Sequence, residues 1–163
     1  METKWSENGD SLETFKNRGK GLMIMLSGTH KRSVDDKGRI ILPVAFKEDL
    51  GFEFIITAGF EDTLMIMSKA EFDKFRESFE RSSPSQRRKL NRYFVGNMHK
   101  ASMDKQGRMQ IPQPLRERVG LGDEVYVVGN GDNAEIWTIE RWETESLMLN
   151  SDSISAAMDD IQA

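Results

Sequence analysis

The sequence contains no cysteine, which excludes a disulfide framework and any zinc site built on thiolates. This absence fits a reducing compartment, and we expect the protein to lie in the cytoplasm. Long apolar runs are missing too. The longest run near the amino end, LMIML at residues 22–26, is far shorter than the roughly 7–15 residues of a signal-peptide core or the roughly 20 of a membrane span. We therefore expect no export and no membrane partner.

Catalytic motifs are also lacking. The sequence has no nucleophile elbow, no Walker loop, no HExxH and no isolated carboxylate pair framed by glycines. We therefore expect no enzyme, no catalytic residue and no small-molecule substrate. Only two histidines occur, His30 and His99, and no carboxylate or cysteine is spaced to complete a ligand set with them, so neither a metal site nor another cofactor is expected. We expect both histidines on strands near a phosphate, which would make binding depend on pH.

The charge that is present is unevenly distributed. The 163 residues are 37% apolar and 31% charged, which is typical of one globular domain or two small joined ones. The net charge of −4 argues by itself against nucleic acid as a partner. However, residues 29–47 and 98–118 each carry five basic and two acidic side chains, or +3, whereas residues 140–163 carry one basic and six acidic side chains, or −5. Two basic segments therefore stand apart from an acidic end.

Both basic segments contain the same motif. The stretch HKRSVDDKGRIILP at residues 30–43 is followed 69 positions later by HKASMDKQGRMQIP at residues 99–112, with His, Lys, Ser, Asp, Gly, Arg and Pro in register. This repeat keeps its charged and turn-forming residues as well as its apolar ones. A duplicated surface is therefore indicated, and not only a duplicated core.

Each repeat predicts the same order of elements. A strand leads to a turn at Gly38 or Gly107, where glycine permits a positive φ. A short strand follows at residues 39–42 or 108–111, and a proline then favours entry into a short helix at residues 44–50 or 113–119. Two further strands make a hairpin, at residues 52–57 and 63–67 or at 124–129 and 134–138. A helix then begins, at the predicted capping box SKAE (68–71) in the first unit.

We divide the chain accordingly. Residues 1–24 are expected to be a flexible extension, although a short helix at residues 11–17 is an alternative. Residues 25–80 form the first unit, 81–94 a helical linker, 95–146 the second unit and 147–163 an acidic tail, either a mobile end or a weak last helix. In the helix that closes the first unit, Phe72, Phe75 and Phe79 recur at spacings of three and four, which predicts an aromatic face packed on the core or on another helix.

Units of about fifty residues bury too little surface to be stable alone. We therefore expect a pseudo-twofold pair, in which strands of one half complete the sheet of the other. The two turns would then emerge on related surfaces.

The repeated turns DDKGRIILP and DKQGRMQIP, the glycine-rich hairpins and the ending EIWTIERW closely resemble the MraZ family, whose halves are modules of the SpoVT/AbrB swapped-hairpin type. The resemblance covers residues 25–145. It implies an α+β fold of two pseudo-repeated β-α-β-β modules, forming an intrachain pseudo-dimeric β-barrel with peripheral helices. One departure is the long start, because members typically begin just before Gly28.

The resemblance also implies a function. Members are bacterial transcription regulators of the division and cell-wall gene cluster, which bind short direct repeats in their own promoter as a ring of subunits. A nucleoid-associated protein that binds double-stranded DNA is expected. The DNA-contacting motif maps onto Asp35, Gly38, Arg39, Asp104, Gly107 and Arg108.

The residues themselves suit that chemistry. The planar forks of Arg39 and Arg108 can grip a guanine edge or a phosphate pair. Asp35 and Asp104, with Gly38 and Gly107, are expected to shape the turns by accepting hydrogen bonds from turn amides or from the neighbouring arginine. Other cations of the repeats would position the backbone of the DNA; they are Lys31, Arg32, Lys37, Lys100 and Lys105.

Three alternatives stay open. The Asp and Arg side chains could make only a structural turn with a salt bridge. In the linker, the basic run of Arg87, Arg88, Lys89 and Arg92 could touch phosphates or form a solvated helix face. The protein could also be an AbrB-type antitoxin-like or other DNA-binding scaffold protein, although such antitoxins usually pair one module with a long disordered tail.

Overall fold

The computed structural model describes residues 25–163 and contains mixed helix and strand structure. The first half comprises β1 (Thr29–Ser33), β2 (Arg39–Ile41), α2 (Phe46–Leu50), β3 (Glu53–Ala58), β4 (Leu64–Ser68), α3 (Lys69–Glu77) and the 3₁₀ helix η1 (Ser78–Arg81). The linker helix is α4 (Pro84–Phe94). The second half comprises β5 (His99–Ser102), β6 (Arg108–Gln110), α5 (Gln113–Val119), β7 (Glu124–Gly129), β8 (Ala134–Thr138), α6 (Ile139–Met148) and α7 (Ser151–Gln162).

Each half supplies an edge strand to the sheet of the other half. The main sheet is antiparallel, with six strands in the order β1-β7-β8-β4-β3-β5. In it, β1 of the first half pairs only with β7 of the second, and β5 of the second half pairs only with β3 of the first. The strands β2 and β6 pair with each other as a separate ribbon. The central strands β4 and β8 also pair across the halves, so strand pairing joins the two halves at four places and neither half contains its own complete sheet.

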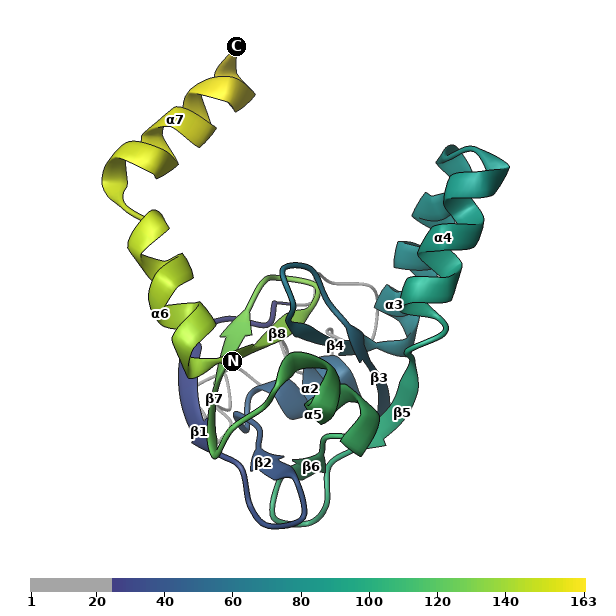
Figure 1. Ribbon diagram of the computed structural model, residues 1–163, viewed down its shortest axis with the longest axis vertical. Coiled ribbons are helices and arrows are strands. Elements are labelled where there is room, and N and C mark those ends of the chain that lie inside the picture. Colours follow the sequence, from purple (N-terminus) through teal and green to yellow (C-terminus); the bar gives the residue numbers. More distant parts are fainter. Residues whose placement is uncertain (1–24) are drawn as a thin grey trace, which may run out of the picture.

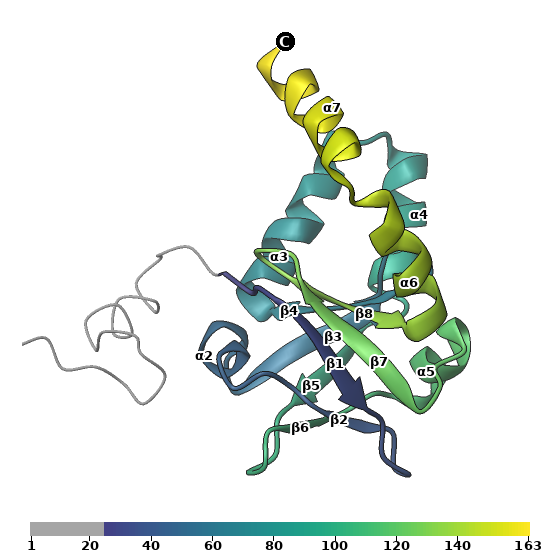
Figure 2. The same ribbon diagram turned by 90° about the vertical axis from the view of Figure 1, so that its left-hand side faces the viewer.

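The predicted closed β-barrel is wrong, because the six-stranded sheet is open. Its edge strands β1 and β5 each have one neighbour. The physical reason lies in the repeated turns, which carry the chain out of β1 into β2 and out of β5 into β6. Since β2 and β6 form hydrogen bonds with each other, they cross the gap without joining the edge strands into one closed ladder (Figures 1 and 2).

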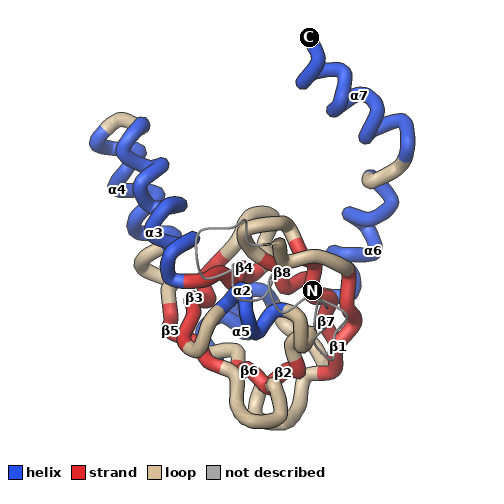
Figure 3. The backbone as a smooth tube through the Cα atoms, turned by 180° about the vertical axis from the view of Figure 1, so that it is seen from behind, coloured by secondary structure: helices blue, strands red, loops and turns tan. Residues whose placement is uncertain are grey.

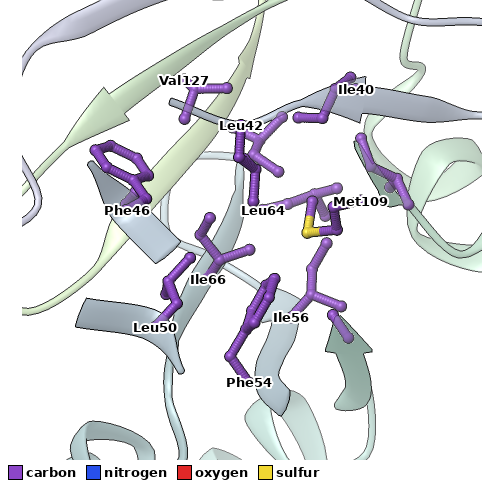
Figure 4. Packing of buried hydrophobic residues seen from close by; sticks show 14 of the residues in the cluster. Ile40, Leu42, Phe46, Leu50, Phe54, Ile56, Leu64, Ile66, Met109 and Val127 are labelled. Carbon is purple, nitrogen blue, oxygen red and sulfur yellow. The ribbon is translucent and has the colours of Figure 1, made fainter. Parts of the chain in front are cut away.

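One hydrophobic core is shared by both halves (Figure 4). The strands β3 and β4 contribute Phe54, Ile56, Leu64 and Ile66, and the ribbon contributes Ile40 and Met109, all at 1% exposure or less. The short helices cap this core through buried residues that the sequence predicted, Phe46 and Leu50 in α2 and Leu115 in α5. The apolar residues of each half therefore lose their contacts with water only when the other half is present.

A second cluster holds the helical hairpin of α3, η1 and α4 to the sheet. The Phe75 ring lies 4.8 Å from that of Phe94 and 5.0 Å from that of Phe79, which confirms the predicted aromatic face. Thr57 Oγ1 donates to the Phe94 carbonyl at 2.6 Å. The helix cap is half of the predicted box, because Ser68 Oγ accepts from the Glu71 amide at 3.1 Å while the Glu71 carboxylate accepts from Lys74 at 3.1 Å.

The helices α3, α4, α6 and α7 extend from the end of the molecule opposite to the two repeated turns (Figures 1 and 3). Within the acidic tail the structure forms the regular helix α7, the second of the two alternatives. None of the helices in residues 25–163 combines the length and apolarity needed to cross a membrane. The predicted extension of residues 1–24, with its alternative helix, lies outside the described residues.

Candidate nucleic-acid interface

The two repeated turns project side by side from one end of the molecule, with the β2–β6 ribbon between their bases (Figure 2). The ribbon fixes their relative position through bonds that cross between the halves. The Gly107 carbonyl accepts from the Leu42 amide at 3.0 Å, and the Gly38 carbonyl accepts from the Ile111 amide at 2.8 Å. Each turn glycine is therefore tied to the other half, which makes the pair of turns one rigid feature.

In the first turn, Asp35 organises the loop with both carboxylate oxygens. Its Oδ1 accepts from the backbone amides of Lys37 at 2.9 Å and Arg39 at 2.8 Å, and its Oδ2 accepts from Arg39 Nε at 2.7 Å. Gly38 has a φ of 74°, in the left-handed region, and its amide donates to the Asp35 carbonyl at 2.9 Å. The carboxylate thus both closes the turn and orients the guanidinium.

The second turn has the same geometry. Asp104 Oδ1 accepts from the amides of Gln106 and Arg108, both at 2.9 Å, and its Oδ2 accepts from Arg108 Nε at 2.8 Å. Gly107 has a φ of 79°. The two roles proposed for the aspartates, accepting from turn amides and pairing with arginine, therefore occur together in both turns.

The arginine tips face outward after this pairing. The side chains of Arg39 and Arg108 are 26% and 31% exposed. Within residues 25–163, the terminal Nη1 and Nη2 of Arg39 have no hydrogen-bond partner, and Arg108 donates through Nη2 only to Gln106 Oε1 at 3.2 Å. Because the Nε edge is held by a carboxylate, the free edge of each guanidinium has a defined direction and can bind an acceptor outside the protein.

The hydrogen bonds of the turns lower the pKa of both aspartates. The Arg39 backbone amide is the main cause of the lowered pKa of Asp35, followed by the Arg39 side chain, and the Arg108 amide is the main cause for Asp104. A lowered folded-state pKa means that these bonds contribute fully above the unfolded-state pKa of about 3.9, and that they are lost as the pH falls through the lower folded value.

We therefore expect the turns to stay closed from neutral pH down to below about pH 4. The measurement is an acid titration followed by the NMR signals of the Arg39 and Arg108 side-chain Nε–H groups. In the Asp35→Asn/Asp104→Asn variant these signals should already be shifted at pH 7. A wild-type transition centred above pH 4 would contradict the assignment of the bonds to the ionised carboxylates.

The other predicted DNA-binding residues lie in three kinds of place. Lys37 and Lys105 are exposed at the tips of the turns. Lys31 on β1 lies 3.8 Å from the Glu124 carboxylate, and Lys100 on β5 lies 4.0 Å from that of Glu53, so both are partly neutralised on the edge strands. The remaining residue, Arg32, donates through Nε to the Ile41 carbonyl at 2.9 Å and through Nη1 to the Lys31 carbonyl at 3.0 Å, joining β1 to β2.

Within residues 25–163, the side chains of His30 and of the linker cations form no hydrogen bond or salt bridge with the turns. His30 Nε2 lies 3.0 Å from the Ser27 carbonyl, and its ring packs edge-on against Phe46 at 5.7 Å. The basic helix α4 lies with the helices at the far end (Figure 1). No group of three or more potential metal ligands gathers in residues 25–163.

Three residues near the turns were missed by the motif search. Gln110 Nε2 donates to the Lys37 carbonyl at 3.0 Å, and Ile41, its counterpart in the repeat, is 52% exposed. Arg116 lies against Gly38, where an added Cβ would collide with its guanidinium, whereas nothing occupies the equivalent space at Gly107. The signal in the sequence was a difference between the repeats, Ile41 against Gln110 and Lys47 against Arg116, and not a shared residue.

A hollow of about 580 Å³ lies beside the first turn. Its lining includes Arg116 together with the carboxylates of Asp35, Asp36, Glu117 and Asp123. Carboxylates outnumber the cation, so the hollow does not suit a phosphate group. The features that suit nucleic acid are therefore the turns and the ribbon, and not this depression.

The structure defines a class of protein with two fused, pseudo-equivalent modules and a pair of Asp–Arg turns at one end. The family model described as "MraZ protein, putative antitoxin-like" matches residues 25–92 and again residues 94–162. The chain belongs to the MraZ family. It is 41% identical over 120 residues to the "Transcriptional regulator MraZ" of Paenarthrobacter aurescens (strain TC1), covering 72% of this chain and 84% of the relative.

Two other relatives match over a longer part of the chain. The "Transcriptional regulator MraZ" of Caldicellulosiruptor bescii is 37% identical over 141 residues, covering 84% of this chain and 99% of the relative. That of Oenococcus oeni is 33% identical over 140 residues, covering 83% and 98%. The family assignment therefore rests on nearly the full length of these proteins.

Proposed function

We propose that this protein is a transcriptional regulator that binds double-stranded DNA in a sequence-specific manner through its two Asp–Arg turns. The observation that carries the proposal is the duplicated geometry, in which Asp35 and Asp104 hold Arg39 and Arg108 by the Nε edge at 2.7 and 2.8 Å. The names of the curated relatives, which are transcriptional regulators, support the same role. No catalytic activity is proposed.

The chemistry of the turns suits the DNA groove. A guanidinium presents donors that match the O6 and N7 acceptors of guanine, and the major groove offers a distinct pattern for each base pair. Lys37 and Lys105 at the turn tips would bind phosphates and make the affinity depend on salt. The net negative charge is compatible with this role, because the acidic residues 140–163 extend from the opposite end (Figure 1).

The family resemblance suggests the target. We place the binding sites in short direct repeats of the protein's own promoter, within the division and cell-wall gene cluster, which implies a nucleoid-associated protein. The halves are then AbrB-type modules of the swapped-hairpin kind, and the crossed pairing of β1 and β5 supports that kinship. An antitoxin-like role is the alternative, favoured by the description of the matched family model.

The test is a binding titration with the fragment upstream of the protein's own gene, at two salt concentrations. We expect binding that weakens steeply as salt rises and that is at least about tenfold tighter than binding to a scrambled fragment of equal length. Equal affinity for both fragments would remove the claim of sequence specificity. No binding to either fragment at either salt concentration would remove DNA as the partner.

We also propose that copies of the chain assemble head to tail. The resemblance to the MraZ family suggests this, because its members form a ring of subunits. The carboxy-terminal arm, α6 and α7, has no buried residue in the single chain. It exposes a set of large apolar side chains, which are Leu147, Met148, Leu149, Ile154, Met158 and Ile161. In α7 these recur at spacings of four and three, so they share one face.

The basic helix α4 is the surface that we propose for docking of this arm. Its eleven residues carry Arg87, Arg88, Lys89 and Arg92 and no acidic side chain, whereas residues 140–163 have a net charge of −5. In one chain α4 and α7 lie on different sides of the molecule (Figure 1). An arm that binds the next copy makes a heterologous contact, which closes into a ring when the rotation between copies permits.

The variant Ile154→Glu/Met158→Glu should shift the assembly to smaller species, because two charges would be buried at the contact. The measurement is light scattering coupled to size-exclusion chromatography. The matched control Ala156→Glu/Ala163→Glu adds the same charge on the opposite side of α7 and at its carboxy-terminal end, and should keep the wild-type mass. An unchanged mass in both variants would rule out this face of α7 as the contact.

A further inference from the structure

The outward face of the β2–β6 ribbon carries side chains that packing and turn formation do not account for. Side chains alternate along a strand, and Ile40 and Met109 point into the core at 1% and 0% exposure. The residues on either side of them therefore face outward. The register places Arg39 opposite Gln110 and Ile41 opposite Arg108, so two arginines, one amide and one apolar side chain share this face.

The exposed Ile41 is out of place for a surface with no ligand. Its side chain is 52% exposed, although it stands on a strand between the two arginine turns. The hydrogen bond that Ile41 accepts from Arg32 Nε, at 2.9 Å, uses its backbone carbonyl oxygen and does not involve its side chain. In the major groove an apolar side chain can contact the methyl group of thymine, while a neighbouring arginine binds guanine.

The side chain of Gln110 is held in place in a way that leaves its polar edge available. Its Nε2 donates one hydrogen bond to the Lys37 carbonyl at 3.0 Å, and its Oε1 accepts no hydrogen bond within residues 25–163. One N–H donor and one carbonyl acceptor remain. That pair matches N7 and N6 of adenine, and holding the amide by one bond lowers the entropy lost on binding.

We propose that Ile41 and Gln110 are base-reading residues, and that their difference gives the protein a direction on DNA. The inference rests on the proposed DNA-binding function and deepens it. A two-stranded antiparallel ribbon fits the major groove. Arg39 and Arg108 alone would present the same chemistry on both sides of the pseudo-twofold axis, which favours an inverted repeat. With Ile41 on one side of the axis and Gln110 on the other, the base pairs contacted by the two halves of the chain differ in sequence. The site bound by one chain then has a direction, which sites arranged as a direct repeat require.

The experiment measures base preference with a panel of operators in which each base pair of the bound promoter site is changed in turn. We expect Gln110→Ala to lower discrimination at one base pair, of A·T type, by about tenfold, and Ile41→Ala to lower it by about fivefold at a different T-containing pair. Affinity for scrambled DNA and its dependence on salt should stay at the wild-type level. The exchange variant Ile41→Gln/Gln110→Ile should prefer the operator in which these two base pairs are interchanged.

The controls separate this inference from the proposed function. Val44→Ala removes a 70% exposed apolar side chain just beyond the ribbon and should change no base preference. Thermal unfolding of each variant shows that the fold is kept. If wild type binds its promoter specifically but Ile41→Ala and Gln110→Ala keep every base preference, or lose affinity equally at all sequences, the inference is overturned while the function stands. If wild type itself shows no specificity, the proposed function fails first.

Discussion

Replacing Arg39 and Arg108 together with alanine is expected to lower the affinity for promoter DNA by about 100-fold or more. Each arginine offers one oriented guanidinium edge, and each good contact of this kind discriminates by about 1–3 kcal/mol, which is roughly 5- to 150-fold per site. Both side chains are partly exposed and bond within their own turn, so the fold should be kept. The measurement is the promoter titration at two salt concentrations.

The matched control is Arg76→Ala/Arg81→Ala, which removes the same charge from α3 and η1 at the far end of the molecule. This variant should bind within about twofold of wild type, because α3 lies at the end of the molecule opposite to the turns (Figure 1) and salt screens interactions between distant exposed charges. The structural alternative, a turn with a salt bridge and no ligand, predicts equal binding by all three proteins. That result would remove the turns from the interface.

Phe54→Ala is expected to lower the free energy of unfolding by about 3–5 kcal/mol. Phe54 is 0% exposed in β3, and in the sheet it stands opposite Ala101 of β5, which belongs to the other half. The cavity would therefore weaken both halves together. The measurement is urea unfolding followed by far-UV circular dichroism and by the fluorescence of the tryptophans, of which Trp137 and Trp142 lie in the second half.

The control for this prediction is the neighbouring Phe52→Ala, because Phe52 is 89% exposed. It should change stability by less than about 0.5 kcal/mol, as surface substitutions generally do. The two signals should coincide in every variant, since one core serves both halves. Separate transitions for the first and second halves would show that the halves are independent domains.

Local features were predicted well because short-range rules determine them. The strands of the second hairpin begin and end at the residues expected from their alternating pattern, and Gly38 and Gly107 adopt the positive φ that their turns require. The carboxylates of Asp35 and Asp104 accept hydrogen bonds within four residues along the chain. Such contacts need no knowledge of the remainder of the fold.

Features that depend on sheet pairing were not predictable in the same way. The basic composition of the repeat suggested a common role for its cations, but the register of β1 against β7 brings Lys31 to Glu124, and that of β5 against β3 brings Lys100 to Glu53. The closed barrel was wrong because the pairing of β2 with β6 was not visible in either repeat alone.

The sequence by itself determined that this protein consists of two related units and that each contains an Asp-x-x-Gly-Arg turn. It also determined that the basic side chains of the repeats are separated along the chain from the acidic side chains of the carboxy-terminal end. The repeat and the turns are defined by residues close together along the chain, so the amino-acid sequence alone is enough to recognise them. Only the tertiary structure decided that the turns lie side by side, that the sheet stays open, and that Ile41 and Gln110 share one face with the arginines. These depend on contacts between residues about 70 positions apart, whose pairing is selected by burial of the common core.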